Sequence, residues 1–124
     1  MNKLDSGKPR VDLIRPEFIL ELGKTLGYGA NKYNESVGDI PNYLKNDGFH
    51  YSRLTAAMER HLLQFKMGVD IDDENGELYH IIQVAANAMM LHSYLVSGKG
   101  IDDRINLKKL RESENTQGTK KEGL

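Results

Sequence analysis

The most apolar stretch of the chain runs from residue 74 to residue 97, and its length and composition predict a helix. Apolar residues fall on almost every side of this helix, which is typical of a helix that is buried nearly all round. His80, Gln83 and Asn87 interrupt the apolar surface at spacings of three and four, so their side chains share one face. Buried polar groups need partners, and the pattern therefore predicts a polar site along this helix.

Two further apolar patterns with helical spacing precede this stretch. The first predicts a helix over residues 16–33, beginning at Pro16, and the second predicts a helix over residues 49–67. His61 falls on the core-facing side of the second helix, where it serves either as a neutral core residue or as a contact to a substrate or metal. The loop between the two helices, residues 34–48, is rich in Asn, Asp and Gly and is long enough to suggest function or mobility.

The acidic turn at residues 70–77 is compatible with either a calcium loop or the start of the long helix. An EF-hand needs alternating ligands and a central glycine, and Gly76 comes one place too late for that pattern. We therefore expect the turn to lead into the third helix, with Asp73 or Asn75 as its N-cap. Glu74 and Glu77 would then lie near the positive end of the helix dipole.

No stretch shows the alternation of a strand, and no hairpin turn separates two apolar runs. The predicted fold class is therefore all-α, a helical bundle of three main helices plus a short C-terminal helix near Leu107 and Leu110. Residues 1–15 are expected to form an extended N-terminal segment and residues 16–105 the all-α domain. Residues 106–124 are expected to form a mobile polar tail, because the chain from residue 112 to residue 123 contains no large apolar residue.

The amino-acid composition limits which partners the protein can bind and where in the cell it is expected. The formal net charge of −1 gives no electrostatic reason to bind nucleic acid or an anionic membrane, and the absence of cysteine excludes thiolate sites. No signal peptide or membrane-spanning run is evident, so a cytoplasmic protein is expected. The third helix has more apolar surface than one chain of this length covers, notably at Met89, Met90 and Val96. That surplus predicts a homo-oligomer, either a dimer or a larger assembly.

Several charged residues have two interpretations from position alone. Glu17 and Glu21 are four residues apart and could approach one ligand together, although Glu17 also suits the first turn of a helix. Lys8 and Arg10 are either solvated charges or groups that face a phosphate.

Short motifs in these regions resemble a known family. Residues 7–33 read GKPRVDLIRPEFILELGKTLGYGANKY, residues 60–63 read RHLL, and Asp72, Glu74, His80 and Asn87 follow. This pattern resembles the phage and prophage dATP/dGTP diphosphohydrolases, the MazZ-like proteins, over residues 7–104. The resemblance implies the all-α NTP pyrophosphohydrolase superfamily, which contains MazG and the dimeric dUTPases.

The resemblance implies hydrolysis of a (deoxy)purine nucleoside triphosphate between its α- and β-phosphates, with release of pyrophosphate and a nucleoside monophosphate in the presence of Mg²⁺, or alternatively Mn²⁺. The catalytic residues that it implies are Glu21, Glu74 and His80. The candidate metal ligands are Glu17, Glu21, Glu59, Asp72, Glu74 and Glu77. The candidate substrate-binding residues are Lys8, Arg10, Tyr28, Lys32, Tyr33, Arg60, His61, Gln83 and Asn87.

Three departures from the family pattern keep a second interpretation open. The paired E-x-x-E and E-x-x-D carboxylates of the superfamily are incomplete here, and the chain has no Trp. Gln83 also stands where relatives often carry a second His. The alternative is a non-catalytic nucleotide-binding protein, a phage or prophage sponge that sequesters a nucleotide signal.

Overall fold

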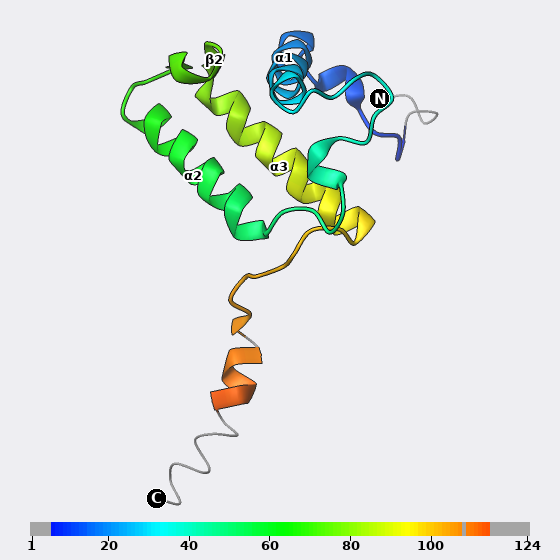
Figure 1. Ribbon diagram of the computed structural model, residues 1–124, viewed down its shortest axis with the longest axis vertical. Coiled ribbons are helices and arrows are strands. Elements are labelled where there is room, and N and C mark those ends of the chain that lie inside the picture. The colour runs from blue at the N-terminus through cyan, green and yellow to red at the C-terminus, as the bar shows by residue number, and fades with distance from the viewer. Residues whose placement is uncertain (1–5, 108, 115–124) are drawn as a thin grey trace, which may run out of the picture.

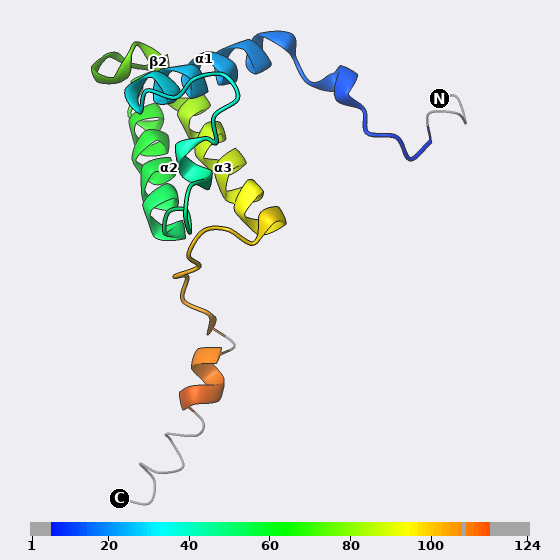
Figure 2. The same ribbon diagram turned by 45° about the vertical axis from the view of Figure 1, so that its right-hand side comes forward.

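The computed structural model describes residues 6–107 and 109–114, and three long helices dominate it. These are α1 (Pro16–Lys32), α2 (Tyr51–Lys66) and α3 (His80–Ser97). Helices α2 and α3 lie side by side and run in opposite directions, and α1 lies across the end where α3 begins (Figures 1 and 2). The predicted all-α fold class is confirmed.

The ends of α1 and α3 follow from local backbone chemistry. Pro16 occupies the first turn of α1, where its fixed φ suits a helix and its missing N–H leaves no bond unmade. Asn34, with φ of 55°, follows the last turn of that helix. Gly98 ends α3 in the left-handed conformation with φ of 77°, and its N–H donates to the carbonyl oxygen of Tyr94.

The segment between α2 and α3 is a small hairpin, so two predictions for this segment were wrong. Strand β1 (Ile71–Asp72) pairs antiparallel with strand β2 (Leu78–Tyr79), and the short 3₁₀ helix η4 (Asp73–Asn75) joins them. The third helix therefore begins at His80 rather than at residue 74, and this chain does contain strands.

Backbone conformation explains why the long helix cannot begin earlier. Gly76 and Glu77 have φ of 79° and 57°, values in the left-handed region that no right-handed helix contains. The Asn75-Gly76 pair forms the turn of the hairpin instead of a helix cap. Tyr79 takes the N-cap position of α3 without a side-chain cap, and neither Glu74 nor Glu77 lies in the first turn of that helix.

The other end of the bundle is organised around Tyr94, which is 0% exposed. Its hydroxyl accepts a hydrogen bond from the backbone N–H of Phe49 (3.0 Å) and donates one to the carbonyl oxygen of Tyr43 (2.6 Å). The Tyr51 ring stacks on the Tyr94 ring, with centroids 6.1 Å apart. At Gly100, a Cβ atom would lie 2.4 Å from Cδ2 of Tyr94, so only glycine fits there.

The chain beyond α3 turns back to the start of α2. His50 and Ile101 form a parallel β-bridge, and the Ser52 N–H donates to Oδ1 of Asp103 at 2.9 Å. Asp103 thus caps a helix to which it is not adjacent in sequence. We refer to residues 43–51 and 94–103, held together around Tyr94, as the Tyr94 clasp.

The two ends of the described chain extend away from the helices (Figure 2). Residues 9–15 contain only the short 3₁₀ helix η2 (Val11–Leu13), and residues 107 and 109–114 are helical, which confirms the short C-terminal helix. The rest of the predicted tail, residues 115–124, lies outside the described residues. Within the described part of the chain, no helix is long and apolar enough to cross a membrane.

Helix α3 is not buried all round in the single chain. Its buried positions are His80, Ile82, Ala86 and Tyr94, whereas Leu95 and Val96 are 62% and 74% exposed. The expectation of burial on every side is therefore wrong for the chain taken alone, because α2 and α1 cover only part of the helix surface.

Candidate functional site

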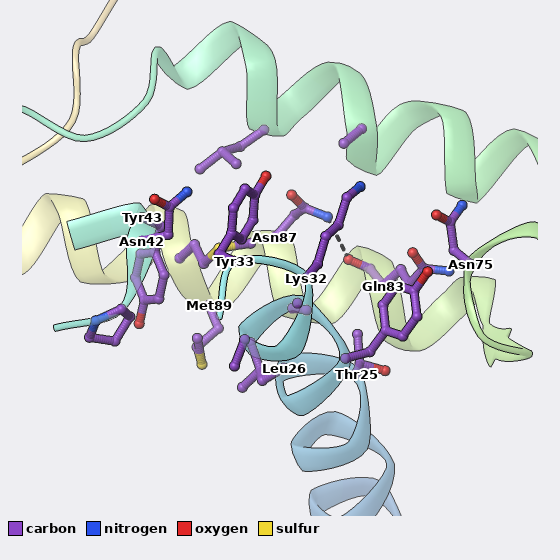
Figure 3. Close-up of a pocket in the computed structure, with 18 of the residues that line it drawn as sticks. Thr25, Leu26, Lys32, Tyr33, Asn42, Tyr43, Asn75, Gln83, Asn87 and Met89 are labelled. Atoms are coloured by element: carbon purple, nitrogen blue, oxygen red, sulfur yellow. Dashed lines mark hydrogen bonds between the residues drawn. The ribbon is translucent and has the colours of Figure 1, made fainter. Parts of the chain in front are cut away.

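A pocket of about 630 Å³ lies among α1, α2, α3, the hairpin and the loop after α1 (Figure 3). This volume falls in the range of small-molecule sites, which are typically apolar with a few placed polar groups. The last two turns of α1 contribute Thr25, Leu26, Tyr28 and Lys32 to its wall. Their spacings place these four side chains toward one side of the helix.

One end of the pocket is aromatic and apolar. Tyr43 and Phe49 from the Tyr94 clasp, with Met89 and Met90 from α3, line this end. The guanidinium carbon of Arg53 lies 4.3 Å from the centroid of the Phe49 ring. Flat apolar surfaces of this kind suit the faces of a planar ring.

The other end carries amide side chains. Gln83, Asn87 and Asn75 line the pocket there, and the Asn87 Nδ2 donates to the backbone oxygen of Gln83 at 2.8 Å (Figure 3). Nε2 of Gln83 and Nδ2 of Asn75 both donate to Oδ2 of the buried Asp72, at 2.9 and 3.0 Å. The polar face of the third helix thus meets the pocket and the hairpin.

Cations outnumber acids in the pocket wall. Among the lining residues, Lys32, Arg53 and Arg60 are basic and Glu35 alone is acidic. Glu35 is engaged through Oε1, which accepts a hydrogen bond from the backbone N–H of Asn42. An excess of positive charge beside an apolar end favours an anionic ligand with a ring.

Thr25 adds a free hydrogen-bonding group. Its Oγ1 atom is buried and lacks a hydrogen-bond partner within the described residues, although Thr25 lines the pocket. Buried hydroxyls are rarely unpaired in folded proteins, so Thr25 is a candidate hydrogen-bonding contact at the pocket wall.

His61, Asp72 and His80 form a cluster adjacent to the amide end of the pocket. The two Nδ1 atoms of the histidines are 2.9 Å apart, and the ligand atoms of all three side chains lie within 4.8 Å of one another. Burial and then the neighbouring His80 lower the pKa of His61, so its neutral form is favoured. Burial opposes the ionisation of Asp72, but hydrogen bonds from Gln83 and Asn75 and the two imidazoles hold its pKa below the ordinary value.

The predicted substrate contacts divide into three groups. The pocket wall contains Tyr28, Lys32, Tyr33, Arg60, Gln83 and Asn87. His61 and His80 lie in the adjacent cluster. Lys8 and Arg10 are exposed in the N-terminal segment, where Arg10 pairs with Asp12 through a 2.9 Å contact.

The predicted metal ligands are also dispersed. Asp72 is buried in the cluster with the two histidines, and Glu21 is half-buried on α1, one turn before Thr25. The exposed members of the set are Glu17, Glu59, Glu74 and Glu77. Within the described residues, His61, Asp72 and His80 are the one group of three or more such side chains close enough to share an ion.

Sequence reasoning missed several residues of the pocket wall, namely Thr25, Asn42, Tyr43, Phe49, Arg53 and Asn75. The length of the 34–48 loop was a signal for Asn42 and Tyr43. The seven-residue spacing of Arg53 and Arg60, which places both on one side of α2, was a signal for Arg53.

Comparison with known proteins places this architecture in context. Residues 1–104 match the family model of the dATP/dGTP diphosphohydrolase N-terminal region. A protein of Salmonella phage PMBT28 called dATP/dGTP diphosphohydrolase is 33% identical over 102 residues, which is 82% of this chain. The aligned region is 32% of that relative, so the chain spans about a third of its length. No solved structure matches the chain.

Proposed function

We propose that this chain, which belongs to the dATP/dGTP diphosphohydrolase family, binds a purine nucleoside triphosphate in its pocket and cleaves it between the α- and β-phosphates. The products would be a nucleoside monophosphate and pyrophosphate. One observation carries the proposal. A single pocket of about 630 Å³ has aromatic side chains at one end and basic and amide side chains in the rest of its wall. The name of the phage relative supports the same substrate class.

The two ends of the pocket assign an orientation to the nucleotide. The base would lie against Tyr43 and Phe49, where ring faces and methionine side chains are available. The triphosphate would extend toward Lys32 and Arg60, whose N–H groups can donate to phosphate oxygens. At the amide end, Gln83 and Asn87 offer side-chain groups to the sugar and the phosphates (Figure 3).

We propose Mg²⁺, or alternatively Mn²⁺, as the ion that enters with the triphosphate. Such ions are commonly held by one or two carboxylates together with phosphate oxygens, so the chain need not supply a full cage. The acids that fit this limited role are Glu35 in the pocket wall and Glu21, which is half-buried on α1 one turn before the pocket-lining Thr25. When bound, the ion neutralises phosphate charge and polarises the phosphoryl group.

Turnover of dGTP and dATP in the presence of Mg²⁺ tests the proposal, with pyrophosphate and nucleoside monophosphate measured separately. Arg60→Ala should raise KM, whereas Lys66→Ala, an exposed change in the last turn of the same helix, should not. Glu21→Gln should lower turnover while nucleotide binding persists. Release of orthophosphate instead of pyrophosphate would refute cleavage between the α- and β-phosphates.

A second candidate function is nucleotide binding without cleavage. The observation that favours it is the dispersion of the predicted acids, because Glu17, Glu59, Glu74 and Glu77 are exposed. Isothermal titration calorimetry distinguishes the two functions. Stoichiometric, tight binding of a purine nucleotide with no product would favour the sponge and contradict the enzyme.

We also propose that the protein self-associates through apolar helix surfaces. On α1, Phe18, Ile19 and Leu20 are 40%, 50% and 74% exposed, and on α3 Val96 is 74% exposed. Exposed apolar surface of this kind is available for contact with a second copy of the chain. Sedimentation equilibrium measures the assembly directly. A monomer at all concentrations would contradict this proposal and leave the nucleotide proposal intact.

A further inference from the structure

The His61–Asp72–His80 cluster is built from three separate elements that converge on one point. His61 comes from α2, Asp72 from β1 and His80 from the first position of α3. Asp72 and His80 are buried and His61 is half-buried. Their ligand atoms all lie within 4.8 Å of one another. We propose that these three side chains bind one divalent transition-metal ion, with Zn²⁺ as the representative ion.

The facing imidazoles support an ion at this point. The Nδ1 atoms of His61 and His80 are 2.9 Å apart, a hydrogen-bonding distance at which one Nδ1 carries the proton and the other accepts it. Two nitrogen ligands about 2.0–2.1 Å from a tetrahedral Zn²⁺ ion lie about 3.3–3.4 Å apart, so the two imidazoles would separate by about 0.4–0.5 Å and turn toward the ion to bind it. The ion would take the place of the Nδ1 proton, which would move to the Nε2 atom of the same imidazole, so that both neutral rings bind the ion through Nδ1.

The carboxylate is already oriented by neighbouring groups. The amides of Gln83 and Asn75 both donate to Oδ2 of Asp72, at 2.9 and 3.0 Å. Among the described residues, none donates to Oδ1, and this oxygen is therefore available to an ion. Hydrogen bonds behind a metal ligand fix its orientation, and they are a regular part of metal sites.

The donor set decides the class of ion. Two imidazole nitrogens and one carboxylate oxygen suit Zn²⁺ and similar first-row ions, whereas Mg²⁺ prefers an all-oxygen shell. Three protein ligands leave a fourth position for water, as in open zinc sites. The site is thus distinct from the Mg²⁺ proposed to enter with the triphosphate, and it does not depend on whether a nucleotide is cleaved.

The position of the cluster suggests what the ion does. Gln83 and Asn75 belong both to the pocket wall and to the hydrogen bonds of Asp72. An ion there would join α2, the hairpin and the start of α3, and would hold these two amides in place. We therefore expect metal binding to stabilise the protein and to tighten nucleotide binding.

The test is isothermal titration calorimetry on the untagged full chain after a chelator has removed bound metal. Zn²⁺ is titrated into the protein in a buffer that contains a large excess of Mg²⁺. We expect one Zn²⁺ per chain and a rise in Tm. His61→Ala and Asp72→Asn should each abolish both effects. Gln83→Ala should weaken Zn²⁺ binding about 10–100-fold through loss of the orienting hydrogen bond.

The chain offers a matched control in His92, an exposed histidine on the same helix as His80. His92→Ala should bind Zn²⁺ as the unaltered protein does. Circular dichroism shows whether each variant is folded, and the nearly isosteric Asp72→Asn variant keeps the test valid if His61→Ala unfolds. The proposal would be overturned if Zn²⁺ did not bind stoichiometrically in the presence of the excess Mg²⁺. It would also be overturned if His92→Ala lost Zn²⁺ binding to the same extent as His61→Ala.

Discussion

Replacing Tyr94 with Phe removes one hydroxyl from the Tyr94 clasp and leaves the buried ring in place. That hydroxyl bonds two backbone groups, the N–H of Phe49 and the carbonyl oxygen of Tyr43. The ring of Phe fills the same volume, so the packing against Tyr51 and Gly100 is retained. The change therefore isolates the contribution of two hydrogen bonds.

The expected loss of stability follows from the groups left behind. An unpaired buried donor or acceptor costs about 1–3 kcal/mol. Because Phe49 and Tyr43 are themselves half-buried, water can reach part of this region. We therefore expect Tyr94→Phe to lower the free energy of unfolding by about 2–3 kcal/mol in total.

Urea denaturation followed by far-UV circular dichroism measures this loss. Tyr79→Phe is the matched control, because Tyr79 is 43% exposed and has no hydrogen bond from its hydroxyl to the described residues. The control should change stability by less than about 0.5 kcal/mol. Tyr94→Phe should also weaken nucleotide binding, since Tyr43 and Phe49 line the pocket. A loss no larger than that of the control would refute the role given to the hydroxyl.

Three further changes test other parts of the fold. The hydrogen bonds to Ser52 lower the pKa of Asp103 below 3.8, so its contribution to stability is present above pH 3.8 and is lost as the pH falls through the folded-state pKa. Asp103→Asn should accordingly unfold at lower urea concentration than the unaltered protein at neutral pH, and the difference should shrink in acid. Gly76→Ala should destabilise the hairpin by at least about 1–2 kcal/mol, because φ is 79° and the new Cβ would lie 2.8 Å from the Tyr28 ring; an unchanged urea midpoint would contradict this. Glu77→Gly should stabilise the protein by up to about 1 kcal/mol, since it relieves a φ of 57°, and a lower Tm would count against the left-handed conformation.

Local sequence signals predicted the helices well and the hairpin poorly. Pro16 and the helical spacing of apolar residues placed α1 and α2 within two residues of their observed ends. The stretch before His80 was misread because Asn75-Gly76 is compatible with both a helix cap and a hairpin turn. The pairing of Ile71 with Tyr79 and of Asp72 with Leu78, which joins the residues on the two sides of the turn, distinguishes the hairpin from a helix cap.

In the candidate site, too, the features set by local spacing could be predicted and the features set by distant contacts could not. Gln83 and Asn87 could be placed beside a pocket because helical spacing puts them on one face. His61 and His80 are 19 residues apart in the sequence and lie on two different helices. Their contact depends on how the helices pack, and the spacing of residues along one helix does not predict it. Phe49 and Tyr43 are held beside the pocket by backbone hydrogen bonds with the Tyr94 hydroxyl, and Tyr94 is 45 and 51 residues away from them in the sequence.

The Tyr94 clasp has a consequence for the order in which the chain folds. Closing the 51-residue loop between Ser52 and Asp103 costs about 3.5 kcal/mol of chain entropy, whereas the hairpin between α2 and α3 closes a much shorter loop. We expect α2, the hairpin and α3 to associate first and the clasp to form last. In the native protein, the amides of Tyr51 and Ile101, which bond across the clasp, should then exchange their hydrogens together and faster than those in the middle of α3. When the clasp opens locally, the aromatic wall of the pocket would separate from the helices, while the contacts among His61, Asp72 and His80 remain intact.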